Sequence, residues 1–255
     1  MDVKVYALLV IHERDCAASP SCVALRRDRI PAVVVDNSVS KNNNYRYCAN
    51  AGFAYRSMGG NRGLAVAYNA GIRYLRSKTD ATHVMILDDD TRLPDGFFER
   101  TATAVAADPN AVVWLPRVMD ERGLLSPCQI HGFHVSRLPE TATPSQEVIS
   151  GINSGMTIAL SFFDTYVYDE GYFLDYIDHA FLRDVKATKG RIVTTEEMLQ
   201  QSFAGNTRGN KKAAAKRFHI FKQDFRRFCG RSIRGRLYAA YVIGRRRMRL
   251  WLKGR

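Results

Sequence analysis

The sequence predicts an α/β protein built on a mostly parallel β-sheet with helices on its faces. Between residues 3 and 194, short apolar runs of strand length alternate with stretches of helical spacing. Two of these runs end abruptly in carboxylates, at Asp36 and at Asp88. In a parallel sheet the carboxyl ends of the strands share one edge, where ligands bind. We therefore expect the functional residues to gather at that edge.

The amino-terminal elements follow from this periodicity. The first two buried strands are predicted at Val3–Ile11 and Ile30–Val35, and the second is followed by Asp36, Asn37 and Ser38. The region is completed by a shorter strand at 53–57, by helices at 22–29 and 64–75, and by a polar loop at 39–50.

The turn before the second helix is rich in glycine, with Gly59, Gly60 and Gly63. Such a turn can present backbone N–H groups to an anion at the start of a helix. It lacks the Lys-Ser/Thr pair of a P-loop and the full dinucleotide fingerprint. An anion-binding turn and a plain turn–helix junction both remain open.

The stretch after the next strand, Val84–Leu87, carries three adjacent carboxylates: Asp88, Asp89 and Asp90. Asp88 and Asp90 are two residues apart, so on extended backbone they point the same way. Hard oxygens gathered on one side suit Mg²⁺ or Mn²⁺. The alternative is a solvated acidic turn that caps the following helix, predicted at Phe97–Ala107.

The second half of the chain is less regular. Residues 116–148 contain four prolines and are predicted to be irregular, and residues 149–160 form a turn and then a buried strand or a helix start. His131 and His134 lie there, and a metal role for them is not favoured. Asp178, as a helix N-cap or a functional carboxylate, precedes a helix predicted at Ala180–Lys189. Strands are predicted at 111–115 and 191–194.

The charge is unevenly placed. Residues 207–255 hold 17 Lys and Arg against one acid, Asp224, whereas the rest of the chain holds 21 basic and 24 acidic residues. Helices are predicted at Lys211–Asp224 and Gly235–Lys253, with aromatic residues among the arginines. Three interpretations remain open: an anionic membrane surface, a helical bundle packed on the body with a solvated basic face, and nucleic acid.

Five scattered cysteines are expected to be reduced thiols, and the first residues lack the features of a signal peptide. No stretch approaches the roughly 20 apolar residues that span a bilayer. The sequence therefore predicts a cytoplasmic protein, peripheral on the inner face of the cell membrane if the basic segment docks there.

Three blocks occur in order: Val33–Ser38; Gly60–Ile72 followed by Val84–Asp90; and Asn153–Gly155 followed by Phe173–Arg183. Together they resemble the family 2 inverting glycosyltransferases, especially the rhamnosyltransferase-like bacterial branch. The resemblance implies a GT-A fold, a Rossmann-like mixed, mostly parallel sheet flanked by helices. That domain would cover residues 1–206, with a nucleotide-binding half at about 1–115 and an acceptor half at about 116–206. Residues 207–255 would form a basic helical C-terminal extension.

The resemblance also implies residue roles. Asp36 would contact the nucleobase, with Asn37 and Ser38 beside it, and the turn Asn61-Arg62-Gly63 would lie against the nucleotide. Asp88-Asp89-Asp90 matches the DXD element. There Asp90 would bind the metal directly, Asp88 would hold the ribose or the metal's shell, and Asp89 would lie with the nucleotide. Asp178 would be the general base, with Asp175 as the second choice.

The reaction so implied moves a sugar from a UDP-, dTDP- or GDP-linked donor to a hydroxyl of a saccharide or lipid-linked acceptor, in surface polysaccharide or glycolipid synthesis. Mn²⁺ or Mg²⁺ would neutralise the leaving diphosphate, and one displacement would invert the anomeric carbon. Two alternatives are a sugar nucleotidyltransferase, for which the segment 12–15 offers only Arg14, and a non-catalytic nucleic-acid-binding protein, which leaves the aspartates unexplained.

One departure concerns the metal. The segment 197–203 places Gln201 where the family often has a histidine that completes metal binding. Glutamine is a poorer ligand, so either the aspartates and the diphosphate hold the metal alone, or His219 substitutes, or activity is weak. His179, beside Asp178, also departs from many relatives.

Overall fold

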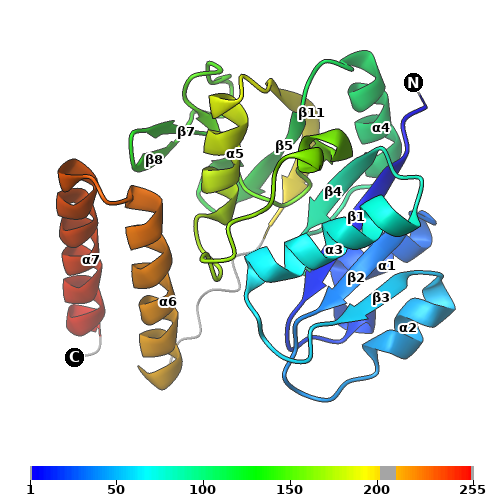
Figure 1. Cartoon of the computed structure of the whole chain (residues 1–255), viewed down its shortest axis with the longest axis horizontal. Helices are drawn as coiled ribbons and strands as arrows, with labels where there is room; N and C mark the ends of the chain where they lie inside the picture. The colour runs from blue at the N-terminus through cyan, green and yellow to red at the C-terminus, as the bar shows by residue number, and fades with distance from the viewer. Residues whose placement is uncertain (1, 202–210, 254–255) are drawn as a thin grey trace.

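The computed structural model describes residues 2–201 and 211–253, and an eight-stranded β-sheet lies at its centre (Figure 1). The strand order is β11-β5-β10-β4-β1-β2-β3, with β6 paired to β5. Only β10 and β6 run antiparallel to their neighbours, which confirms the mixed, mostly parallel sheet. The strands are β1 (Val5–Ile11), β2 (Ala32–Asp36), β3 (Ala54–Ser57), β4 (His83–Leu87), β5 (Val113–Asp120), β6 (Gly123–Ser126), β10 (Thr157–Ala159) and β11 (Ile192–Gln200).

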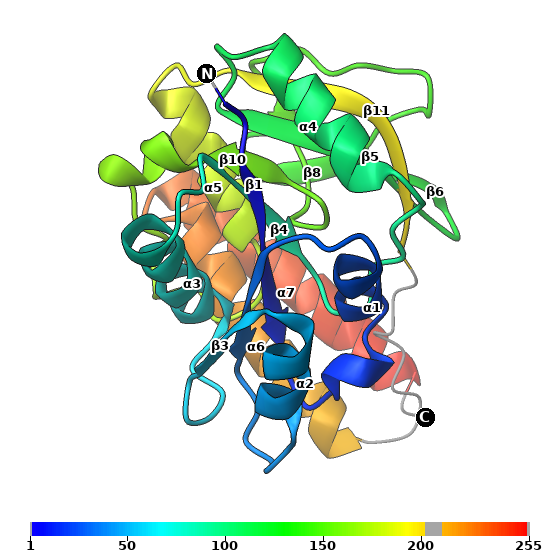
Figure 2. The ribbon, with the colours of Figure 1, turned by 90° about the vertical axis from the view of Figure 1, so that its right-hand side faces the viewer.

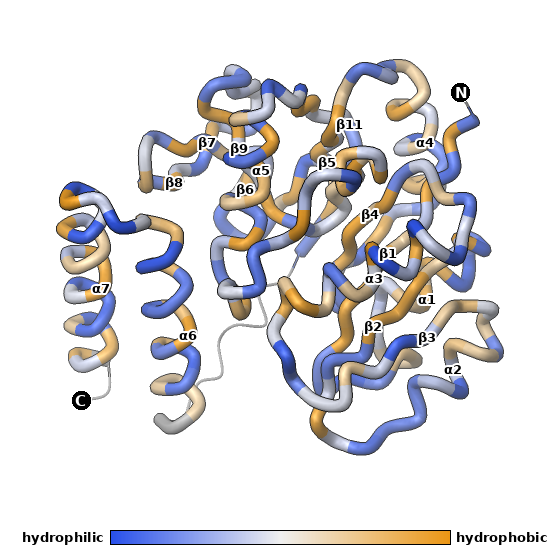
Figure 3. Tube along the Cα trace, in the orientation of Figure 1, coloured by the Kyte–Doolittle hydropathy of each residue, from blue (hydrophilic) through white to orange (hydrophobic). Residues whose placement is uncertain are grey.

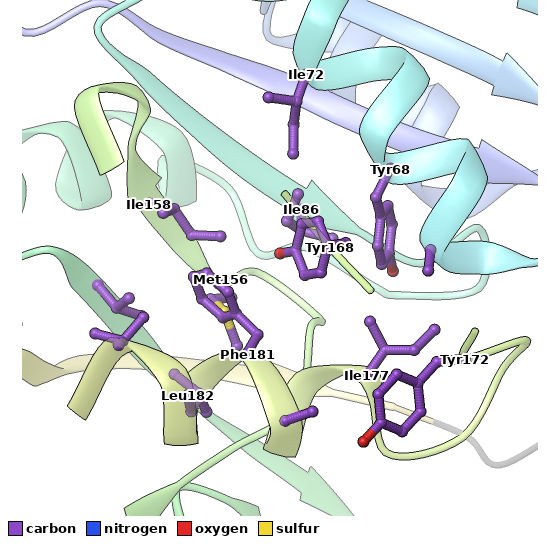
Figure 4. Close-up of a cluster of buried hydrophobic side chains, with 14 of the residues drawn as sticks. Tyr68, Ile72, Ile86, Met156, Ile158, Tyr168, Tyr172, Ile177, Phe181 and Leu182 are labelled. Atoms are coloured by element: carbon purple, nitrogen blue, oxygen red, sulfur yellow. The ribbon is translucent and has the colours of Figure 1, made fainter. Parts of the chain in front are cut away.

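Alternate side chains of the central strands pack on opposite faces of this sheet. Leu8, Val33 and Ile86 lie on the face covered by α3 (Leu64–Lys78) and α5 (Ile177–Ala187), and Figure 4 shows part of this cluster. The next residue of each strand faces the other side, where α1 (Pro20–Arg27), α2 (Asn44–Ala51) and α4 (Phe97–Ala107) pack (Figure 2). Each fully buried aliphatic side chain contributes about 1.5–3 kcal/mol, so this alternation fixes the strand register.

Helix α3 lies unusually close to β1. A Cβ atom built on Gly71 would lie 2.2 Å from Cδ1 of Leu8, so only glycine permits this approach. The helix carries the glycine turn at its amino end, and its contact with β1 therefore fixes where that turn lies relative to the sheet edge.

Three sequence expectations are corrected. Residues 116–148, predicted to be irregular, contain the end of β5, all of β6, and the hairpin of β7 (Cys128–His131) and β8 (His134–Arg137), to which β9 (Ile149–Ser150) adds. The predicted loop 39–50 contains α2, whose Cys48 is buried against Cys16. Strand β11 runs six residues beyond the predicted Thr194. In each case long-range pairing supplies partners that local composition does not reveal.

The carboxyl-terminal helices α6 (Lys211–Cys229) and α7 (Ile233–Lys253) form a hairpin beside α5 (Figure 1). Phe221, Phe225 and Phe228 of α6 are buried in the same cluster as Ile177 and Phe181 of α5. Helix α6 therefore packs on the body of the protein. The predicted boundary between residues 206 and 207 lies outside the described residues. No helix in the described ranges is long and apolar enough to cross a membrane.

Candidate functional site

The first two predicted carboxylates lie at the same edge of the sheet. Strand β1 pairs in parallel with β2 on one side and with β4 on the other. The register sets Ile11 opposite Asp36 and Leu9 opposite Leu87, which directly precedes Asp88. The predicted convergence of Asp36 and Asp88 at the carboxyl edge of the parallel strands is therefore confirmed.

Asp36 is 2% exposed, and its carboxylate is held by four donors. Burial alone would raise the pKa of Asp36, but hydrogen bonds, first from Ser38 and Asn44, outweigh it and leave the pKa below its ordinary value. The donors are the Ser38 backbone N–H at 3.0 Å, Asn42 Nδ2 at 3.0 Å, Asn44 Nδ2 at 2.9 Å and the Tyr55 hydroxyl at 3.0 Å. The sequence analysis missed the last three, although the run Asn42-Asn43-Asn44 was a visible signal.

Asn37 ties strand β2 to the glycine turn. Its Oδ1 accepts a hydrogen bond from the Arg62 backbone N–H at 2.8 Å, and its Nδ2 donates to Asn61 Oδ1 at 3.2 Å. Gly63 follows with a φ of 90°, a value that favours glycine. The structure thus brings together Asn37, Asn61, Arg62 and Gly63. His12, which the sequence analysis did not single out, joins them, since its Nδ1 lies 3.0 Å from the Asn37 carbonyl.

The three adjacent aspartates have different surroundings. Asp88 Oδ2 accepts hydrogen bonds from the Ser154 hydroxyl and, at 3.2 Å, from Gln201 Nε2. Burial raises the pKa of Asp88 to about 6, and the negative charges of Asp90 and Asp178 add to the rise. Asp89 instead lies 3.4 Å from Arg14 Nε. Asp88 and Asp90 therefore act on each other electrostatically, while Asp89 has its own counter-ion.

Gln201 lies at the Asp88 carboxylate, which is where the resemblance predicted a metal-site residue. Its Oε1 also accepts from the Ser154 hydroxyl at 3.1 Å, and the sequence analysis did not assign Ser154 a role. No group of three His, Cys, Asp or Glu side chains that could hold a metal occurs within the described ranges. His134 lies elsewhere, with its Nδ1 3.0 Å from the Tyr238 hydroxyl. In the described ranges, the residues of this edge that could hold a divalent ion are Asp88 and Asp90, and Gln201 hydrogen-bonds to Asp88.

Asp178 lies in the first turn of α5, and the N-cap position is occupied by Tyr176, so the N-cap interpretation of Asp178 is wrong. The negative charge of Asp178 contributes to the raised pKa of both Asp88 and Tyr68. Asp175, the second choice, forms an ion pair with Arg217. The structure thus commits Asp175 to a guanidinium, whereas the charge of Asp178 acts on Asp88.

Several buried polar atoms near these carboxylates have no hydrogen-bond partner within the described residues. They include the hydroxyl of Tyr68, which is 0% exposed, Oδ1 of Asn153, which is 6% exposed, and Oγ1 of Thr91, which directly follows Asp90. In Figure 4, Tyr68 reaches from α3 toward Ile177 at the start of α5, and Ile86 of β4 lies beside it. Unsatisfied buried groups are rare and often mark functional sites.

Asp224 of α6 organises the loop that precedes Asp178. Its fully buried carboxylate accepts three backbone hydrogen bonds, from the N–H groups of Phe173 at 3.0 Å and of Leu174 and Asp175 at 2.8 Å. The Phe173 carbonyl in turn accepts from the Leu64 N–H at 2.7 Å, at the amino end of α3. The only acid of the basic segment was therefore a signal that the sequence analysis passed over.

Solved structures resemble this one in fold. They include TarS 1-349 of S. aureus, alone (12% identity, TM-score 0.55) and in complex with UDP-GlcNAc (12%, 0.59). A third is the mannosyltransferase PcManGT of Pyrobaculum calidifontis in complex with GDP-Man and Mn²⁺ (14%, 0.56). The matches cover 89%, 89% and 94% of this chain, which spans 64%, 66% and 69% of those chains.

No curated protein gives a significant match to this sequence. The family model described as glycosyl transferase family 2 matches residues 20–161, which is more than half of the chain. The matched segment runs from α1 to the η2 turn (Leu160–Asp164) and includes Asp36, the glycine turn and the aspartate triplet. This chain therefore belongs to glycosyl transferase family 2.

Proposed function

We propose that this protein transfers a sugar from a nucleoside diphosphate to an acceptor hydroxyl, with inversion at the anomeric carbon. The aspartate triplet at the carboxyl end of β4 carries the proposal, because the Asp88 carboxylate is desolvated there and the charges of Asp90 and Asp178 act on it. The glycine turn is hydrogen-bonded to Asn37 and also contacts Phe173, in the loop that precedes Asp178. Structural neighbours that bind UDP, UDP-GlcNAc and GDP-Man support a nucleotide-sugar donor. A hexosyl or rhamnosyl donor and a role in surface polysaccharide or glycolipid synthesis follow from the resemblance.

The nucleotide would occupy the part of the edge formed by β2 and the glycine turn. Asp36, Asn37 and Ser38 would face the base, and Asn61, Arg62 and Gly63 would lie against the rest of the nucleotide. Asp36 already accepts four hydrogen bonds from its own chain, so it would act as a rigid, charged support for the base-binding loop. The exposed Arg62 side chain is the nearest cation of this turn for a diphosphate.

The donor set of the aspartate triplet fits a divalent cation. Asp88 and Asp90 supply hard carboxylate oxygens, and their mutual repulsion would be relieved by a cation between them. Since the described residues supply no third acidic or histidine ligand, diphosphate oxygens and water would complete the coordination of Mn²⁺ or Mg²⁺. When bound, such an ion stabilises the negative charge of a leaving nucleoside diphosphate.

Asp178 is the proposed general base. It would accept the proton of the acceptor hydroxyl as that oxygen attacks the sugar from the face opposite the diphosphate. Asp175 is held by Arg217 and by the Asp224 carboxylate through its backbone N–H, so we propose a supporting role for it. A nucleotidyltransferase is less well supported, because Arg14, its one candidate triphosphate ligand, faces Asp89.

A thermal-shift screen of nucleotide sugars, with and without Mn²⁺, tests the donor and the metal together. We expect one nucleoside diphosphate class to raise the Tm in a metal-dependent way, since a ligand at 100 times its Kd adds about 2.7 kcal/mol. The Asp90→Ala variant should lose the metal-dependent part. Asp95→Asn, whose carboxyl group is 91% exposed, is the control and should behave like the wild type. Equal stabilisation of Asp90→Ala by metal and donor would remove Asp90 from the proposed site.

The basic segment is proposed to bring the enzyme to an anionic membrane surface on the cytoplasmic side. Helix α7 exposes Leu237, Tyr241, Met248 and Leu252 at helical spacing among its arginines. An exposed basic helix with such a face binds anionic lipid surfaces. Nucleic acid would be bound by charge alone and would not engage the apolar residues.

A further inference from the structure

A cavity of about 820 Å³ lies between the α6–α7 hairpin and the β7–β8 hairpin. Tyr176, at the start of α5, forms part of its wall, and so do residues of α6, α7 and β8. It is distinct from the aspartate edge, since none of Asp88, Asp90 and Asp178 lines it. Its lining is aromatic and cationic, and it contains no carboxylate.

Four guanidinium groups line this cavity: Arg122, Arg245, Arg246 and Arg249. None of them has an ion-pair partner within the described ranges. Arg246 is half-buried, and its guanidinium carbon lies 3.8 Å from the centroid of the Phe221 ring. The charge of Asp175 acts on Arg246, but that carboxylate is already paired with Arg217, and a ring face compensates a partly desolvated cation only in part. Arg122, Arg245 and Arg249 are exposed and add positive charge to a lining without a carboxylate. The cavity therefore favours an anion.

Apart from His134, the rest of the wall is aromatic or aliphatic. Phe133, Phe225 and Tyr238 line it, and Tyr238 stacks on Phe133 with ring centroids 6.2 Å apart. Tyr241 belongs both to this wall and to the exposed apolar face of α7, where Leu237 is 67% exposed and Tyr241 62%. Apolar residues on α7 are also visible in Figure 3. The apolar surface thus continues from the cavity onto the outside of the helix.

We propose that this cavity binds the phosphate or diphosphate headgroup of a lipid, with the hydrocarbon chain along the exposed apolar face of α7. Guanidinium groups recognise phosphate oxygens through paired hydrogen bonds. A second cavity of about 470 Å³ serves as a contrast: Arg226, Arg231 and Arg236 line it, but no aromatic residue does. Both cavities therefore carry positive charge, but only the first combines it with an aromatic wall, as an amphiphilic ligand requires.

The position of the cavity connects it to the candidate active site. Tyr176 immediately precedes α5, and Asp178 follows two residues later. A lipid phosphate in the cavity would therefore reach the wall formed by Tyr176, two residues before the proposed base. The idea that this lipid carries the acceptor sugar rests on the proposed function. Binding of the lipid phosphate does not depend on it.

Calorimetric titration of the full chain with water-soluble lipids tests the proposal. We expect dihexanoyl phosphatidic acid to bind, and inorganic diphosphate and dihexanoyl phosphatidylcholine to bind at least tenfold more weakly. The double variant Arg245→Gln/Arg249→Gln should weaken phosphatidic acid binding about tenfold, a loss of about 1.4 kcal/mol. The control Arg234→Gln/Arg247→Gln removes the same charge from exposed positions of α7 outside the cavity and should change binding less than threefold.

Three outcomes would overturn the proposal. Equal binding of inorganic diphosphate would make the cavity a simple anion site, and equal binding of phosphatidylcholine would make it a simple apolar one. Equal weakening by both double variants would reduce the effect to the overall charge of α7. Thermal shifts with nucleotide-sugar donors, measured on the same variants, test the transferase assignment independently of lipid binding. Lipid binding without any donor binding would contradict the proposed function and leave the cavity assignment intact.

Discussion

At the scale of single residues, Asp178 is the sharpest test of the proposed chemistry. Asparagine keeps the size and the first-turn position of Asp178 but cannot accept a proton. We expect Asp178→Asn to retain donor binding and to lose transfer by about 10²–10⁴-fold, the usual contribution of general base catalysis. Initial rates and donor Kd should be measured together. Asp175→Asn, the same change at the second-choice residue, serves as the comparison. Transfer by Asp178→Asn at the wild-type rate would show that Asp178 is not the base.

Asp36 gives a prediction about pH. Because its pKa in the folded protein lies below its ordinary value, its charged form stabilises the fold. This contribution is fully present above the unfolded pKa of about 3.9 and is lost as the pH falls through the lower folded value. Asp36→Asn should therefore cost about 1–3 kcal/mol at pH 7 and progressively less in acid.

Urea unfolding at several pH values measures this effect. Asp95→Asn is the matched control, because its side chain is 91% exposed and should leave the free energy of unfolding nearly unchanged. A loss for Asp36→Asn that is the same at pH 7 and in strong acid would contradict the pKa argument.

At the scale of elements, α6 is expected to stabilise the loop before Asp178. Asp224→Ala would leave the partly buried N–H groups of Phe173, Leu174 and Asp175 without their acceptor. An unsatisfied buried donor costs about 1–3 kcal/mol, and water that reaches these partly buried groups makes the sum smaller. We expect a loss of about 3 kcal/mol in the free energy of unfolding, and faster hydrogen exchange of those three amides.

Gln223→Ala changes the preceding, exposed residue of the same helix and is the control for helix propensity. It should alter the free energy of unfolding by less than about 0.5 kcal/mol. Unchanged amide exchange at 173–175 in Asp224→Ala would show that another group holds this loop.

At the scale of the whole molecule, the basic segment is expected both to complete the fold and to bind membranes. A chain that ends at Thr207 would expose the cluster that Phe221, Phe225 and Phe228 cover and would lose Asp224. Truncation should therefore lower the Tm, so membrane binding is better tested by substitution on the exposed face of α7.

We expect Leu237→Gln/Met248→Gln to weaken pelleting with vesicles that contain anionic lipid, because both side chains are more than half exposed and apolar. Pelleting should also fall as salt rises. Val167→Gln, which replaces an apolar side chain that is 65% exposed outside α7, is the control for exposed apolar area. Unchanged pelleting of the α7 variant, or tighter binding to random oligonucleotides than to vesicles, would contradict the membrane proposal.

Many of the strands and helices can be predicted from the local pattern of apolar and polar residues. Val33–Val35 and Val84–Leu87 are short apolar runs that end in aspartate, and such runs become buried strands with carboxylates at their carboxyl ends whatever surrounds them. Other features depend on distant partners. Helix α2 forms within an asparagine-rich segment because Cys48 is buried and Asn44 bonds to Asp36, and neither contact is visible from residues 39–50 alone.

The sequence by itself determined the α/β class, the sheet edge that carries Asp36 and Asp88, and the family, because these depend on hydrophobic periodicity and on motifs within short windows. Only the tertiary structure decided that Arg217 pairs with Asp175, that Ser154 bonds to Asp88, and that Asp224 of the basic segment holds the loop before Asp178. These contacts join residues 42 to 66 positions apart, and packing alone brings such residues together.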